Sequence, residues 1–436
     1  MKKLLSVLLL LATLCSTALA SELRLYRISP KYEPGCVLFA GEHPDVTFQS
    51  SGDDYQTTED MLSQMNLGLF HNDVFKMSGG NIDPRRIMAA GHCLDLSGSE
   101  VIAGLVGRML PQIAAQVTLD GRILGIPYGI DFSYTTVDSG WATAGFTDAD
   151  IPRTYPELLD FLDQWVREDR GSVTVCNQWE PSLYGPGSYT AWLTGELLSA
   201  YLLERSFAGK PLVFEEAELL PLLARTREIG EALYRHAPQP NGAYELFVPG
   251  DGWPLSPDER VVSFRLSDEQ PLLIHADFSI LSASAATEHP EAAIALLEDV
   301  LLNLDEANAA FFYPDAQPVR DSFAVSEAAR VARDIEDWQE QLASDALAAD
   351  ERSRLEQSMA IYEDYLAQLE AREYAVSPRQ LTSYRQHLDQ VAIDRSHALS
   401  RNTPAGWEIY QLEQRFAQGE LTPEALLQAL NRLAQP

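Results

Sequence analysis

Cysteine is scarce in this chain, with four residues in 436, at positions 15, 36, 93 and 176. No Cys-x-x-Cys pair occurs, so a zinc or redox site built on thiols is not expected. Three cysteines follow the N-terminal segment, which permits at most one internal disulfide and leaves one thiol over. Cys36 and Cys93 are expected in the same half of the protein, but their spacing does not decide whether they pair.

Basic residues are also few: 32 Lys and Arg stand against 64 Asp and Glu, a formal net charge of −32. Such an excess of negative charge excludes nucleic acid and anionic membrane surfaces as natural partners. It favours the solubility of an exported protein and carries no information about the fold.

Enzyme motifs are missing as well. The sequence has no His-Glu-x-x-His, no Walker loop, no Gly-x-Ser-x-Gly and no Gly-x-Gly-x-x-Gly. The eight histidines are scattered, and His92 beside Cys93 is expected to be structural. Asp53, Asp54 and Asp73 could be paired as in a glycosidase, although neighbouring carboxylates mean little in so acidic a chain. We therefore expect no enzyme activity, no cofactor and no metal.

The N-terminus has the order of a secretory signal. Lys2 and Lys3 precede the apolar run Leu4 to Leu14, and Ala18-Leu19-Ala20 provides small residues for cleavage after Ala20. The run is shorter than the ~20 residues of a membrane span. Because Leu14 precedes Cys15 where a small residue is usual, lipid anchoring at Cys15 is the less favoured reading. A periplasmic or extracellular protein is predicted.

The remaining ~415 residues exceed what one core usually organises, so two lobes are expected. Alternating patterns predict strands at 23–28, 46–49 and 69–77, and helical spacing predicts helices at 58–66, 101–116 and 155–167. Strands separated by helices favour an α/β fold with parallel sheets. The segment 326–373 has no Gly or Pro and is helical in pattern almost throughout.

Aromatic residues gather in or beside Gly- and Pro-rich segments of the second half, at Trp179, Tyr184, Tyr189, Trp192 and Trp253. Large rings on loops can stack on the apolar faces of sugars while nearby polar groups bind the hydroxyls. Each ring taken alone could equally fill a core.

Several segments resemble, in order and spacing, the family 1 extracellular solute-binding proteins, which include the maltose- and oligosaccharide-binding components of ABC importers. The most similar segment is Asp-Gly-Arg-Ile-Leu-Gly-Ile-Pro-Tyr, 120–128. Others are Glu-His-Pro-Asp-Val at 42–46, Asn-Asp-Val-Phe at 72–75, Leu-Asp-Leu-Ser at 94–97, Ala-Gly-Phe at 144–146, Ile-Pro-Arg-Thr-Tyr-Pro-Glu-Leu at 151–158, Phe-Ser-Ile at 278–280, Glu-His-Pro-Glu-Ala-Ala at 288–293 and Gln-Gly-Glu-Leu-Thr-Pro-Glu-Ala at 418–425. The long helical stretch from about 326 to 397 and the short segment 29–41 depart from the family pattern.

The resemblance implies a two-lobed periplasmic-binding-protein fold of type II-like kind. Each lobe would be a mostly parallel sheet flanked by helices, with an extended helical C-terminal region. After a signal at 1–20, lobe 1 would comprise 21–131 and 272–318, and lobe 2 would comprise 132–271 and 319–436. A monomer would hold its ligand between the lobes and deliver it to ABC transporter permease subunits.

Ligand-binding residues can then be nominated by position, because loops at the carboxyl ends of strands face the cleft in open α/β sheets. The nominated residues are Tyr26, Arg27, Asp53, Asp54, Tyr55, Met77, Ser78, Tyr128, Asp131, Trp179, Trp192 and Trp253.

A carbohydrate, in particular an oligosaccharide, is the expected ligand. A polyamine, peptide or other small solute is the alternative within the same fold, since Asp53, Asp54 and Asp131 would suit a cation. A secreted polysaccharide hydrolase and a sensor subunit are the alternatives of other classes.

Overall fold

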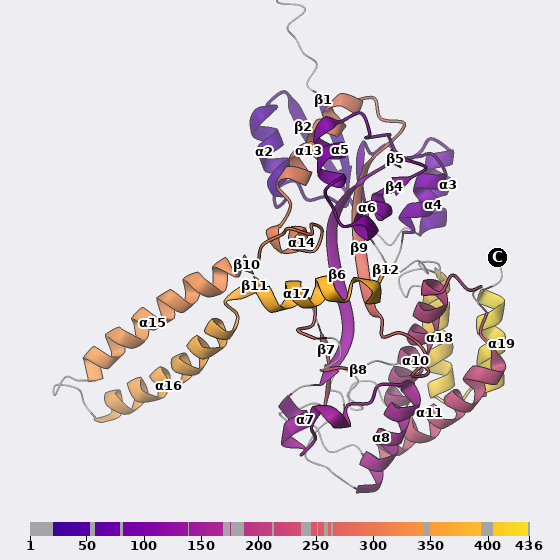
Figure 1. Cartoon of the computed structure of the whole chain (residues 1–436), viewed down its shortest axis with the longest axis vertical. Helices are drawn as coiled ribbons and strands as arrows, with labels where there is room; N and C mark the ends of the chain where they lie inside the picture. The colour runs from indigo at the N-terminus through magenta and orange to yellow at the C-terminus, as the bar shows by residue number, and fades with distance from the viewer. Residues whose placement is uncertain are drawn as a thin grey trace, which may run out of the picture. The chain divides into compact units, whose positions relative to one another are not determined.

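The computed structural model describes residues 21–434 except for 53–56, 79–81, 138, 169–174, 176–186, 212, 237–245, 251, 257–259, 263–264, 343–348 and 394–403. The predicted signal segment 1–20 lies outside the described residues. The chain divides into two compact units, one of 1–304 with 387–436 and one of 305–386. Figure 1 labels the elements of both.

The sheet of the first unit begins with three parallel strands. β1 (Ser21–Tyr26) lies between β2 (Val46–Ser51) and β3 (Val74–Met77), so the order β2-β1-β3 requires crossovers. Leu23, Leu25 and Val74 are completely buried, because the strands are covered by helices. The predicted strands were therefore correct, although β3 is shorter than the 69–77 pattern indicated.

Five short helices accompany these strands. α3 begins at the Thr57 N-cap, whose side chain accepts from the Asp60 backbone N–H while Asp60 Oδ2 accepts from the Thr57 N–H at 3.3 Å. This reciprocal pair is a capping box, and it explains why the predicted bounds of this helix were correct. The five are α2 (Pro34–Glu42), α3 (Thr58–Asn66), α4 (Pro84–Ala89), α5 (Glu100–Val106) and α6 (Pro111–Val117). The small hairpin β4 (Thr118–Leu119) and β5 (Arg122–Ile123) follows.

Two long antiparallel strands continue the sheet (Figure 1). β9 (Ile274–Ala283) pairs with β3 on one side and with β6 (Ile126–Val137) on the other. The far end of β6 pairs instead with β7 (Phe247–Gly250) and β8 (Val261–Val262). The short β12 (Val391–Ile393) adds a parallel pairing to β9. The sheet is thus parallel at β2-β1-β3 and where β12 joins β9, and antiparallel across β3-β9-β6-β7.

Long amphipathic helices enclose a second core that includes Tyr155, Leu197, Phe247 and Phe416. The Tyr155 hydroxyl donates to Leu193 O at 2.9 Å and meets the Thr226 hydroxyl, so the polar group of this fully buried ring is satisfied. The elements are α7 (Ser139–Thr143), the 3₁₀ turn η1 (Asp148–Asp150), α8 (Tyr155–Glu168), α10 (Ser188–Phe207), α11 (Glu216–His236), α18 (Pro404–Ala417) and α19 (Pro423–Leu433). α13 (Pro290–Leu302) packs on α2 at the other end of the unit, and the 3₁₀ turn η3 (Leu388–Gln390) precedes β12.

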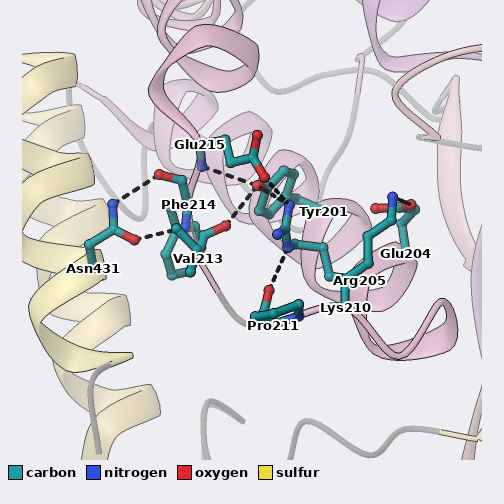
Figure 2. Close-up of polar contacts among 9 residues, drawn as sticks. All are labelled: Tyr201, Glu204, Arg205, Lys210, Pro211, Val213, Phe214, Glu215 and Asn431. Atoms are coloured by element: carbon teal, nitrogen blue, oxygen red, sulfur yellow. Dashed lines mark hydrogen bonds and ion pairs between the residues drawn. The ribbon is translucent and has the colours of Figure 1, made fainter.

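A buried arginine forms hydrogen bonds within the connection between α10 and α11 (Figure 2). Arg205 donates through Nε to Pro211 O at 2.7 Å and through Nη1 to the Tyr201 hydroxyl at 2.8 Å. Asn431 of α19 exchanges two hydrogen bonds with the Phe214 backbone, at 2.8 and 2.9 Å. These bonds satisfy backbone groups of a connection that joins two core helices, and we assign the cluster a structural role.

The second unit is largely a pair of helices that lie side by side, α15 (Ser322–Leu342) and α16 (Ala349–Ala371). They share a small core of Ala324, Val331, Ile335 and Leu369. α14 (Glu306–Ala310), β10 (Val319–Arg320), β11 (Tyr374–Val376) and α17 (Pro378–Gln386) complete the unit.

Two further findings bear on the sequence-based expectations. Cys36 and Cys93 are both buried free thiols, so they are not bridged to each other. Cys15 and Cys176 lie outside the described residues. Within the described part of the chain, no helix combines the length and the apolar character needed to cross a membrane.

Candidate functional site

The first strand ends in a strained residue. Arg27 has a φ of 57°, a left-handed conformation that non-glycine residues adopt rarely, and its N–H donates to Ser51 O at 2.8 Å. Its guanidinium lies 5.6 Å from the centroid of the Tyr26 ring. Backbone strain of this kind costs about 1–3 kcal/mol and is concentrated at functional sites. The conformation therefore marks the carboxyl end of β1 as a candidate site.

A lysine, a tyrosine and a glutamate form the centre of the site. Lys76 of β3 places its ammonium 4.7 Å from the centroid of the Tyr128 ring of β6. The Tyr128 hydroxyl donates to Glu33 Oε2 at 2.5 Å, and Glu33 is a buried carboxylate at the N-cap of α2. Burial lowers the pKa of Lys76 below its ordinary value, and Asp131, Asp277 and Glu33 oppose that shift.

Two aspartates face each other next to this centre. Asp131 of β6 and Asp277 of β9 are direct partners in the antiparallel register. Side chains at directly opposed positions are about 5 Å apart, and like charges there repel. Both act on the Lys76 ammonium, together with Glu33, while Arg27 acts on it with the opposite sign. Five charged groups from β1, β3, β6, β9 and the start of α2 thus influence one another; we call Arg27, Glu33, Lys76, Tyr128, Asp131 and Asp277 the strand-end cluster.

The nominated residues fall in different surroundings. Arg27, Tyr128 and Asp131 belong to the strand-end cluster, and Tyr26 packs beside it with a buried ring. Ser78, which directly follows β3, is partly exposed, whereas the Met77 side chain is completely buried.

The nominated tryptophans are buried where the structure describes them. Trp192 stands on α10 in the second core, 6.4 Å from the Phe247 ring, and Trp253 packs edge-on against Phe132 at 5.2 Å. Their ligand contacts stay predictions. Asp53, Asp54, Tyr55 and Trp179 lie outside the described residues.

An aromatic pair with one exposed ring was missed by the sequence analysis. Trp407, 55% exposed, stacks on Tyr410 of the same helix α18, with ring centroids 5.3 Å apart and planes inclined by 29°. Ile409 and Phe416 of that helix are buried, so the helix turns its apolar face to the core, leaving Trp407 exposed and Tyr410 half-buried. The i, i+3 spacing of the two rings was a readable signal. Glu33 and Lys76 were missed because neither has a sequence signature.

The site can bind polar, uncharged groups through both donors and acceptors. Lysine and arginine supply donors, and the carboxylates supply acceptors. Among the residues that the structure describes, no group of three or more His, Cys, Asp or Glu could hold a metal ion.

Comparison with solved structures identifies similar architectures. A chitin oligosaccharide binding protein is 14% identical with a TM-score of 0.51, and the match covers 95% of this chain and 98% of that one. An ABC substrate-binding protein from Listeria monocytogenes in complex with cycloalternan is 12% identical with a TM-score of 0.49 and the same coverage. Maltose-bound T. maritima MalE3 is 13% identical with a TM-score of 0.48, covering 95% of this chain and 99% of that one. No protein-family model and no curated sequence matches the chain.

At such low identity the likeness establishes the fold and not the ligand. It confirms the predicted α/β fold of the two-lobed periplasmic binding proteins over nearly the whole chain.

Proposed function

We propose that this protein is the extracytoplasmic solute-binding component of an ABC importer and that it captures a carbohydrate, in particular an oligosaccharide. It binds without chemical change and hands the ligand to permease subunits in the cytoplasmic membrane. The N-terminal signal, cleaved after Ala20, exports it, and it acts as a monomer.

The observation that carries the proposal is the strand-end cluster, in a fold shared with a chitin oligosaccharide binding protein. The cluster holds donors and acceptors in fixed positions at the carboxyl ends of β1 and β3, where α/β sheets bind ligands. Sugar hydroxyls are both donors and acceptors, so they match such a mixed set better than a purely acidic or purely basic one.

Trp407, exposed on α18 and stacked on Tyr410, offers a separate stacking surface. The apolar face of a pyranose ring can pack against an indole. Binding that contacts both lobes would favour the closed state by the differential affinity of the ligand for the two states.

The proposal is tested by thermal shift and calorimetry of the mature protein with chito-, malto- and xylo-oligosaccharides. A ligand that binds only the folded state stabilises it by about 2.7 kcal/mol at a hundredfold excess over Kd. We expect Trp407→Ala to weaken oligosaccharide binding about tenfold or more, because the stacking face is lost. Trp407→Phe retains a ring and is expected to retain much of the affinity.

Phe323→Ala is the matched control, because Phe323 is also an exposed ring, 65% exposed, but belongs to the unit 305–386. It is expected to leave binding unchanged. No binding of any oligosaccharide would overturn the proposal, as would release of the chromophore from a chromogenic glycoside, which would indicate the hydrolase instead.

A further inference from the structure

The strand-end cluster contains a lysine among its carboxylates. Glu33, Asp131 and Asp277 provide three carboxylates, and the Lys76 ammonium is under the influence of all three. Lys76 is held in place by the ring of Tyr128, whose hydroxyl is bound in turn to Glu33. Tyr128 therefore links the lysine to one of the carboxylates that act on it.

A positive charge near Asp131 and Asp277 is needed for a structural reason. Asp131 and Asp277 are direct cross-strand partners, an arrangement that is destabilising for two carboxylates unless a positive group lies nearby. Arg27 and Lys76 bring two positive charges to three negative ones, so the described cluster carries a net charge of about −1. Without Lys76 the same groups would carry about −2, in a chain whose net charge is −32.

We propose that Lys76 is a specificity-determining residue: its ammonium stands among these carboxylates where a cationic solute would otherwise bind, so the site takes neutral polyhydroxylated ligands and rejects polyamines. The inference rests on the proposed function and refines it, because it decides between the two ligand classes that the sequence left open. The mechanism is repulsion of an incoming cation by the Lys76 ammonium.

Three features make Lys76 the residue that determines ligand specificity. The Lys76 side chain is partly buried, and its burial lowers the pKa of the ammonium while the three carboxylates oppose that shift. It projects from a strand, β3, and is held against Tyr128, so its position is defined. Arg27, the other cation, is directed over the ring of Tyr26 instead.

The test is calorimetric titration of spermidine and putrescine into the wild type and into Lys76→Gln, Lys76→Met, Lys76→Arg and Lys31→Gln at 150 mM NaCl. We expect Lys76→Gln and Lys76→Met to bind spermidine about tenfold more tightly or better than the wild type, because one repulsive charge beside the carboxylates is removed. Lys76→Met keeps the apolar stem against Tyr128, so it covers the case in which the glutamine variant fails to fold.

Lys76→Arg retains the charge and is expected to exclude spermidine as the wild type does. Lys31→Gln removes the same charge from an exposed position and controls for the general attraction of polyamines to an acidic protein. The proposal is overturned if a folded Lys76→Gln or Lys76→Met binds spermidine no better than the wild type, or if Lys31→Gln gains as much.

The wild type is also titrated with oligosaccharides in the same series. Their failure to bind would count against carbohydrate capture, whereas the comparison of spermidine affinities among the variants would still decide the role of Lys76. The two failures are therefore distinguishable.

Discussion

Single residues owe their properties at this site to what surrounds them. Lys76 and Glu33 are ordinary residues in the sequence, and only the approach of β3, β6 and the start of α2 gives them partners. Arg27 was nominated from its position after β1, but its left-handed backbone, with φ at 57°, could not be predicted, because arginine does not favour that conformation.

The properties of Cys36 and Cys93 also depend on their surroundings. Burial raises the pKa of both thiols to about 12, and the carboxylate of Glu33 adds to the effect at Cys36. An unfolded thiol ionises near pH 8.5, so the unfolded state gains thiolate at a pH where the folded state does not. The contribution to stability is therefore complete below pH ~8.5 and is lost as the pH rises toward 12.

We expect each of these thiols to reduce the free energy of unfolding by about 1–2 kcal/mol between pH 7.5 and pH 10. Urea denaturation at the two pH values measures the loss, and the Cys36→Ala/Cys93→Ala variant is the reference. An equal loss in that variant would show that other groups cause the pH dependence.

Elements were predicted well where local signals mark their ends. The residues Thr57 and Thr422 are favourable N-cap types, and each accepts a hydrogen bond from a backbone N–H in the first turn of its helix. The pattern over 101–116, in contrast, predicted one helix where the structure has α5 and α6. Gly107 ends α5 and Pro111 begins α6. Both helix-breaking residues were visible in the sequence, but the prediction followed the continuous apolar periodicity instead.

The helix pair α10 and α11 depends on a close approach at Gly230. A Cβ added there would lie 2.7 Å from Thr190 Cα, closer than real side chains approach a backbone atom. Gly230→Ala is therefore expected to lower the free energy of unfolding by about 1–3 kcal/mol through overpacking.

Gly104→Ala is the matched control, because Gly104 lies in the interior of α5 with open space around it. It is expected to raise stability by up to about 1 kcal/mol through better helix propensity. Chemical denaturation compares the two variants. A Gly230→Ala protein as stable as the wild type would mean that the two helices can separate without loss.

The whole molecule carries twice as many acidic as basic residues, so repulsive pairs outnumber attractive ones. Self-repulsion of this size destabilises the compact state and is screened by salt. We expect Tm to rise by several degrees between 10 mM and 500 mM NaCl, measured by calorimetry. KCl should act equally, since the effect is one of ionic strength. A flat or falling Tm would show that attractive ion pairs dominate.

Composition, pattern and the ordered motif resemblance were sufficient for the two-lobed α/β fold, because strand and helix periodicities and turn signals are local properties of the chain. The pairing of strands that are distant in the sequence could not be predicted from the sequence. The antiparallel β9, which brings Asp277 opposite Asp131, and the separate unit of 305–386 both arise from contacts between distant segments. The strand-end cluster likewise depends on which strands become neighbours. A charged residue interacts strongly with a partner only when tertiary packing removes both from water, and the sequence does not show which residues are packed together.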